Sequence, residues 1–91
     1  MGEYGGQKSP KEIMILLSKN IISLRKQGKM SQRELSERSG VTYASIRKFE
    51  STGIISLERL LKISEALKRL TDFESILLPS DMKRKKDLFN Y

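Results

Sequence analysis

The sequence predicts an all-α domain of five helices with a flexible segment at each end. Three observations support this fold class. Apolar residues recur at helical spacing, residues suited to helix capping precede these stretches, and glycine or proline follows most of them. Alternation typical of strands is sustained nowhere in the 91 residues, and a chain of this length has room for one domain.

The first helix is predicted over residues 10–27. Pro10 suits the first turn of a helix, and Ser9 before it can accept a hydrogen bond from an early backbone N–H. Gly28 ends the predicted helix. The apolar stripe that we expect to face the core consists of Ile13, Leu17, Ile21 and Leu24.

Residues 31–50 predict two short helices joined by a tight turn. Ser31 and Glu34 have the spacing of a capping box, in which each side chain binds the other residue's backbone N–H. Gly40 can end the first of these helices because a residue without Cβ adopts the left-handed conformation at little cost.

The second short helix can be capped by Thr42, and its apolar residues Ile46 and Phe49 fall on one face. A short helix with cationic and amphipathic groups facing outward suits the DNA major groove. The residues on or near that outward face are Tyr43, Ala44, Arg47 and Lys48.

Two further helices are predicted after this pair. Ser56 can cap a leucine-rich fourth helix. Thr71 and Glu74 have capping-box spacing for a short fifth helix that runs through Leu77 and is stopped by Pro79.

The chain divides into three predicted segments. Residues 1–9 are glycine-rich and we expect them to be flexible, residues 10–78 form the domain, and residues 79–91 form a basic tail. The tail has three interpretations. Its four consecutive cations could bind phosphates, its apolar residues Leu88, Phe89 and Tyr91 could dock into a partner protein, or it could be an untethered terminus.

The net charge of +7 and the pI of about 9.9 favour either a polyanion partner or solubility alone. The absence of Cys and His excludes disulfides, thiolate or imidazole metal sites and the usual nucleophilic triads. We therefore expect no catalytic residues, no metal and no cofactor. No apolar run is long enough for a bilayer and the N-terminus lacks a secretory h-region, so we expect a cytoplasmic protein without membrane contact.

Leu24 to Glu50 resembles the helix-turn-helix of phage-repressor-like (Xre/Cro-CI) proteins, and the resemblance covers roughly residues 13–70. It implies a phage-repressor-like fold that binds double-stranded DNA. Many members have glycine at the place of Lys29, whereas the glycine of this chain is Gly28. The residues that match are Arg25, Ser31, Gln32, Leu35, Gly40, Val41, Ile46 and Glu50.

This resemblance implies roles for individual side chains. Gln32 would bind a DNA phosphate and brace the recognition helix, while Arg25 and Glu50 would form a structural ion pair. Arg47 could grip guanine O6 and N7 with two hydrogen bonds. For Gln32 and the groove-facing residues the alternative is an ordinary solvated side chain, and for Ser51 and Thr52 it is simple loop chemistry. The predicted DNA-binding residues are Gln32, Thr42, Tyr43, Ala44, Ser45, Arg47, Lys48, Ser51 and Thr52.

Residues 49–77 are similar to the corresponding part of HipB-like antitoxins, a subset of that family. Such proteins repress their own promoters as dimers and hold a HipA-type kinase toxin. A C-terminal apolar patch exceeds what one short helix can bury, so we predict a homodimer interface there. The alternative is that this patch folds back on the first helix. Its residues are Leu70, Phe73, Ile76, Leu77 and Leu78.

The sequence thus predicts a homodimeric transcriptional repressor whose third helix reads the major groove of an inverted-repeat operator. The alternative is an antitoxin that captures a HipA-type kinase and represses its own promoter. RNA binding is a weaker third interpretation, because the chain has only six aromatic residues (three Tyr and three Phe) and no predicted sheet on which bases could stack.

Overall fold

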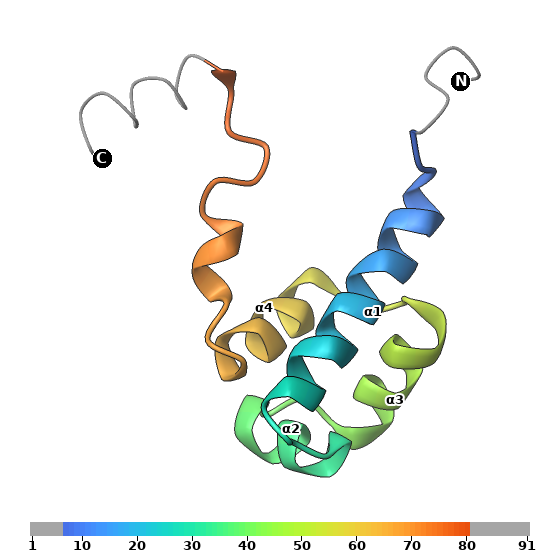
Figure 1. Cartoon of the computed structure of the whole chain (residues 1–91), viewed down its shortest axis with the longest axis vertical. Coiled ribbons are helices and arrows are strands. Elements are labelled where there is room, and N and C mark those ends of the chain that lie inside the picture. The colour runs from blue at the N-terminus through green and yellow to red at the C-terminus, as the bar shows by residue number, and fades with distance from the viewer. Residues whose placement is uncertain (1–6, 81–91) are drawn as a thin grey trace.

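Four α-helices and one short 3₁₀ helix make up the part of the chain that the structure, a computed structural model, describes, residues 7–80 (Figure 1). The prediction of an all-α fold is confirmed within these residues, but the prediction of five helices is wrong. The elements are α1 (Pro10–Gln27), α2 (Gln32–Ser39), α3 (Tyr43–Thr52), α4 (Leu57–Ala66) and the 3₁₀ helix η2 (Leu70–Phe73).

Most of the two predicted terminal segments lies outside the described residues, so their interpretations remain predictions. This applies to the tail cations and to the tail residues Leu88, Phe89 and Tyr91. Among residues 7–80, no helix is both long enough and apolar enough to cross a membrane.

Each α-helix begins with a hydroxyl cap. Thr42 and Ser56 each accept a hydrogen bond from the backbone N–H three residues on, at 3.2 Å, and Ser9 does the same before α1. The predicted capping box at α2 is only half formed. Ser31 accepts from the Glu34 N–H at 3.0 Å, but the Glu34 carboxylate pairs with the Arg38 guanidinium at 2.9 Å, one helical turn on.

The core lies where the four α-helices meet. Leu35, Ile46 and Ile63 are completely buried, and Phe49 is nearly so. Because α2, α3 and α4 each place at least one of these side chains in the same cluster, their relative orientation is fixed by packing. The whole buried apolar cluster consists of Ile21, Met30, Leu35, Val41, Ile46, Phe49, Leu60 and Ile63.

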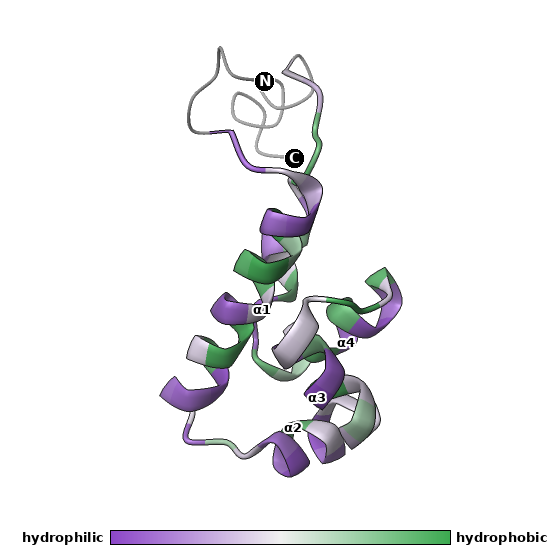
Figure 2. Ribbon diagram, turned by 90° about the vertical axis from the view of Figure 1, so that its right-hand side faces the viewer, coloured by the Kyte–Doolittle hydropathy of each residue, from purple (hydrophilic) through white to green (hydrophobic). Residues whose placement is uncertain are grey.

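The N-terminal half of α1 and the segment after η2 both extend away from this core on the same side (Figures 1 and 2). Figure 2 shows apolar residues along this exposed part of α1. Ile13, Met14 and Leu16 are each about 40% exposed. The expectation that Ile13 faces the core is therefore wrong, because the first turns of α1 project beyond the helices that could cover them.

The predicted fifth helix is replaced by η2 and a series of turns. Thr71 lies inside η2 and cannot act as an N-cap, which requires extended backbone. Two residues with positive φ, Lys68 at 62° and Leu77 at 61°, bound this segment. A helix of six residues after Thr71 is marginal by itself, and the segment instead forms a 3₁₀ turn from which Phe73 packs against the core.

Candidate nucleic-acid interface

The turn between α2 and α3 is held by local hydrogen bonds. Gly40 has a φ of 77° and donates its N–H to the Ser36 carbonyl at 2.9 Å, which ends α2. The Ser36 hydroxyl donates to the Val41 carbonyl, and the Val41 N–H donates to the Ser39 hydroxyl. With Val41 buried in the core, the start of α3 has a defined position and direction.

Helix α3 divides cleanly into a buried and an outward face. Ile46 and Phe49 lie in the core, whereas Ala44, Arg47 and Lys48 are exposed. Of the other predicted DNA-binding residues, Thr42, Ser51 and Thr52 are exposed and Gln32, Tyr43 and Ser45 are half-buried.

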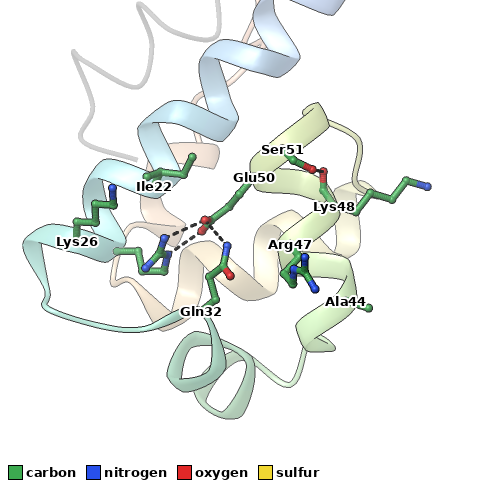
Figure 3. A pocket seen from close by; sticks show the side chains of 9 residues that line it. Ile22, Lys26, Gln32, Ala44, Arg47, Lys48, Glu50 and Ser51 are labelled. Carbon is green, nitrogen blue, oxygen red and sulfur yellow. Dashed lines mark hydrogen bonds and ion pairs between the residues drawn. The ribbon is translucent and has the colours of Figure 1, made fainter.

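A buried ion pair ties α1 to the end of α3. The Arg25 guanidinium donates to both Glu50 carboxylate oxygens, at 2.7 and 2.9 Å, and its third nitrogen donates to the Met30 carbonyl at 2.8 Å. The Gln32 amide donates to the same carboxylate at 2.8 Å (Figure 3). The side chains of Arg25 and Glu50 are only 11% and 6% exposed, so α1, α2 and α3 are locked together at one point.

An open hollow of about 660 Å³ lies beside this network, between the end of α1 and the outward face of α3 (Figure 3). Three exposed cationic residues line it: Lys26, Arg47 and Lys48. A basic hollow at the edge of an outward-facing helix can accommodate a phosphate backbone while the helix itself enters a groove.

A family model described as helix-turn-helix matches residues 21–73. The chain belongs to the helix-turn-helix family. The predicted Xre/Cro-CI type is confirmed, and the protein is a DNA-binding transcription regulator. Comparisons with curated proteins and with solved structures find no match. The matched range leaves out residues 10–20, the projecting half of α1.

The loop before α2 shows how this regulator departs from the glycine common in its family. Lys29 has a φ of 55°, in the left-handed region that favours glycine. Gly28, the neighbouring glycine, has a φ of −82° and needs no such freedom. A lysine therefore adopts the left-handed conformation in this loop, at a cost in conformational energy.

Several predicted phosphate donors already have partners within the regulator. The hydroxyls of Ser51 and Thr52 both donate to the Lys48 carbonyl, at 3.2 and 2.6 Å. The Thr42 hydroxyl donates to the Ser45 hydroxyl, which leaves the Ser45 proton available to an acceptor. Gln32 also keeps one amide hydrogen beyond the one that Glu50 accepts, so bracing and phosphate binding are compatible.

One side chain of this surface was missed by sequence reasoning. Arg33, the second residue of α2, places its guanidinium carbon 4.2 Å from the centre of the Tyr43 ring. Arg47 approaches the same ring at 5.6 Å. Arg47 lies one turn after Tyr43, so its approach follows from helical spacing, whereas Arg33 comes from another helix and no sequence pattern predicts its position.

The residues of the predicted dimer patch divide into two groups. Phe73 packs against the core, and Ile76 lines an apolar hollow with Leu17 and Ile21 of α1. Leu77 is 95% exposed. The predicted residues Leu70 and Leu78 are exposed and half-buried, respectively. The segment therefore lies partly back on α1 and still leaves leucine side chains uncovered.

Proposed function

We propose that the protein is a transcriptional repressor that binds an inverted-repeat operator as a homodimer, with α3 of each subunit in the major groove. The observation that carries this proposal is the outward face of α3, fixed at its start by the Gly40 turn and at its end by the buried carboxylate of Glu50. Half-sites would lie about 34–36 Å apart, one helical turn of DNA. Repression would follow from occupying promoter DNA.

The exposed start and middle of α3 would recognise the DNA bases. Arg47 would donate two hydrogen bonds to guanine, while Ala44 or the Thr42 methyl would contact a thymine methyl. Gln32 and Ser45 would bind phosphates and so fix the position of α3 along the duplex. Lys26 and Lys48, which line the basic hollow, would support them. The hydroxyls of Ser51 and Thr52 would have to exchange their present carbonyl partner for a phosphate.

Selection of bound duplexes from a random pool tests the operator proposal. The wild type should enrich an inverted repeat. Arg47→Ala should relax the preference at one base pair of each half-site, a loss of about 1–3 kcal/mol in discrimination. Gln32→Ala should weaken binding equally across sequences. If Arg47→Ala weakens all sequences equally, Arg47 is a phosphate contact. Failure of the wild type to enrich any sequence would contradict the proposal.

Support for the homodimer comes from the C-terminal segment. Leu77 combines 95% exposure with a φ of 61°, and Ile76 is 53% exposed. A leucine exposed in this backbone conformation gains nothing in a monomer, whereas a second subunit could cover it. In sedimentation equilibrium the wild type should be a dimer. Leu77→Asp should shift it to the monomer, whereas Ile54→Asp, a change of a half-exposed apolar residue after α3, should not.

The second candidate function is that of an antitoxin that also captures a HipA-type kinase. It is favoured by the apolar side chains of Ile13, Met14 and Leu16, which project from α1 outside the range matched by the family model. A kinase-like gene beside this one, and its product in an affinity pulldown, would support the antitoxin. An unrelated gene neighbourhood would favour a free-standing repressor.

A further inference from the structure

The surface that faces DNA in the proposed function contains an aromatic ring with two guanidinium groups beside it. Tyr43 is the first residue of α3 and is half-buried, so its ring is partly held by its surroundings. The guanidinium of Arg33 lies over this ring at 4.2 Å from its centre, and that of Arg47 lies at 5.6 Å. Both distances are within the range of a cation–π interaction.

Neither of these two arginines is neutralised by a carboxylate among residues 7–80. The guanidiniums of Arg25, Arg38 and Arg69 pair with Glu50, Glu34 and Asp72, respectively. Arg33 and Arg47 have no such ion pair within the described part of the chain, and both are exposed. Their charge is therefore available to an anionic partner.

A guanidinium stacked on an aromatic face keeps its hydrogen-bond donors. The N–H groups point outward in the plane of the guanidinium, and the stack involves only its faces. The Tyr43 ring, close to Arg33 at 4.2 Å and further from Arg47 at 5.6 Å, favours these side-chain positions without occupying a donor of either guanidinium, which lowers the entropy that each side chain loses on binding. Such an arrangement is preorganised for an anion.

We infer that Tyr43 is a positioning residue that holds Arg33 and Arg47 as one unit, and that Arg33 is a DNA-phosphate contact supplied by α2. This inference rests on the proposed function and deepens it. In helix-turn-helix complexes the first helix of the motif crosses the DNA backbone while the second enters the groove, so Arg33 on α2 is suited to phosphate and Arg47 on α3 to a base. The ring of Tyr43, rather than its hydroxyl, carries the function.

The first test measures binding to a mixed-sequence duplex over a range of salt concentrations. Arg33→Ala should lower the slope of log affinity against log salt by about 1 for each subunit bound. Arg38→Ala is the matched control, because Arg38 lies on the same helix but pairs with Glu34 and contacts no aromatic ring. It should leave the slope nearly unchanged. An Arg33→Ala slope equal to that of the wild type would overturn the phosphate contact.

The second test separates the ring from the hydroxyl, using the duplex enriched from a random pool. Tyr43→Phe should bind as the wild type does, and Tyr43→Leu should bind about two- to tenfold more weakly for each guanidinium released, the cost of ordering that side chain on binding. The effect of Arg33→Ala should be smaller in the Tyr43→Leu background than in the Tyr43→Phe background. Equal loss in Tyr43→Phe and Tyr43→Leu, or a strictly additive double mutant, would overturn the positioning role.

A third measurement needs no DNA and so separates this inference from the proposed function. In the free protein, the side-chain protons of Arg33 should show upfield ring-current shifts in the NMR spectrum. The shifts should persist in Tyr43→Phe and disappear in Tyr43→Leu. Their absence from the wild type would refute the stack. If the shifts are present but the wild type binds neither duplex, the proposed function fails. If the wild type binds both duplexes and Arg33→Ala changes neither the affinity nor its salt dependence, only this inference fails.

Discussion

Replacement of Gly53 by alanine should destabilise the fold far more than the same change at Gly40. Both glycines end a helix with positive φ, 82° at Gly53 and 77° at Gly40. They differ in their surroundings. A Cβ at Gly40 would meet nothing within 4 Å, whereas a Cβ at Gly53 would lie 3.0–3.2 Å from backbone atoms of Met14 and Ile15 in α1. Helix α3 can approach α1 this closely only because residue 53 has no side chain.

The magnitude follows from two separate costs. An L-residue in the left-handed conformation costs about 1–2 kcal/mol, which applies to both variants. Forcing extra atoms into a packed contact costs about 1–3 kcal/mol more, which applies to Gly53→Ala alone because the obstacle is backbone that cannot rotate away. We expect the free energy of unfolding to fall by about 1–2 kcal/mol in Gly40→Ala and by about 2–5 kcal/mol in Gly53→Ala.

Urea unfolding followed by circular dichroism measures both values, provided that the slope against urea stays constant. In thermal unfolding, each kcal/mol corresponds to about 4–8 °C in a domain of this size. Equal losses in the two variants would refute the reasoning, because they would mean that the approach to α1 imposes no constraint. If Gly53→Ala is too unstable to measure in buffer, both variants should be compared in a stabilising osmolyte, where the same order is expected.

Three other predictions concern the backbone angle of Lys29, the buried ion pair and the carboxylate of Glu12. Lys29→Gly should raise the free energy of unfolding by about 1 kcal/mol, because φ at this position is positive; a loss of stability in urea would contradict this. Glu50→Ala should cost about 3–5 kcal/mol by leaving the Arg25 guanidinium buried and unpaired, whereas Arg38→Ala, which breaks an exposed pair, should cost less than about 1 kcal/mol in the same assay. The Ser9 backbone N–H, the Ser9 hydroxyl and nearby Lys8 hold the pKa of Glu12 below its ordinary value of 4.5. The Glu12 carboxylate should therefore stabilise the fold above its unfolded pKa, and this stabilisation should be lost as pH falls through its folded pKa. An NMR titration midpoint of Glu12 above 4.5 would exclude this.

The sequence by itself determined where the four α-helices begin, because a hydroxyl cap and its N–H partner are only three residues apart. Ser9, Thr42 and Ser56 act as expected from their spacing, and Gly40 ends α2 for a reason local to its own backbone. The buried and outward faces of α3 were also predictable, since helical periodicity alone separates Ile46 from Arg47.

The tertiary structure decided the features that depend on contacts between residues of different helices. Thr71 and Glu74 have the spacing of a capping box, but the chain after α4 forms a 3₁₀ turn from which Phe73 contacts the core. Arg33 and Tyr43 are brought together by the angle between α2 and α3, which depends on packing in the core. Such contacts depend on the distances and angles between packed helices. These are set by the whole core, so no short stretch of sequence predicts them.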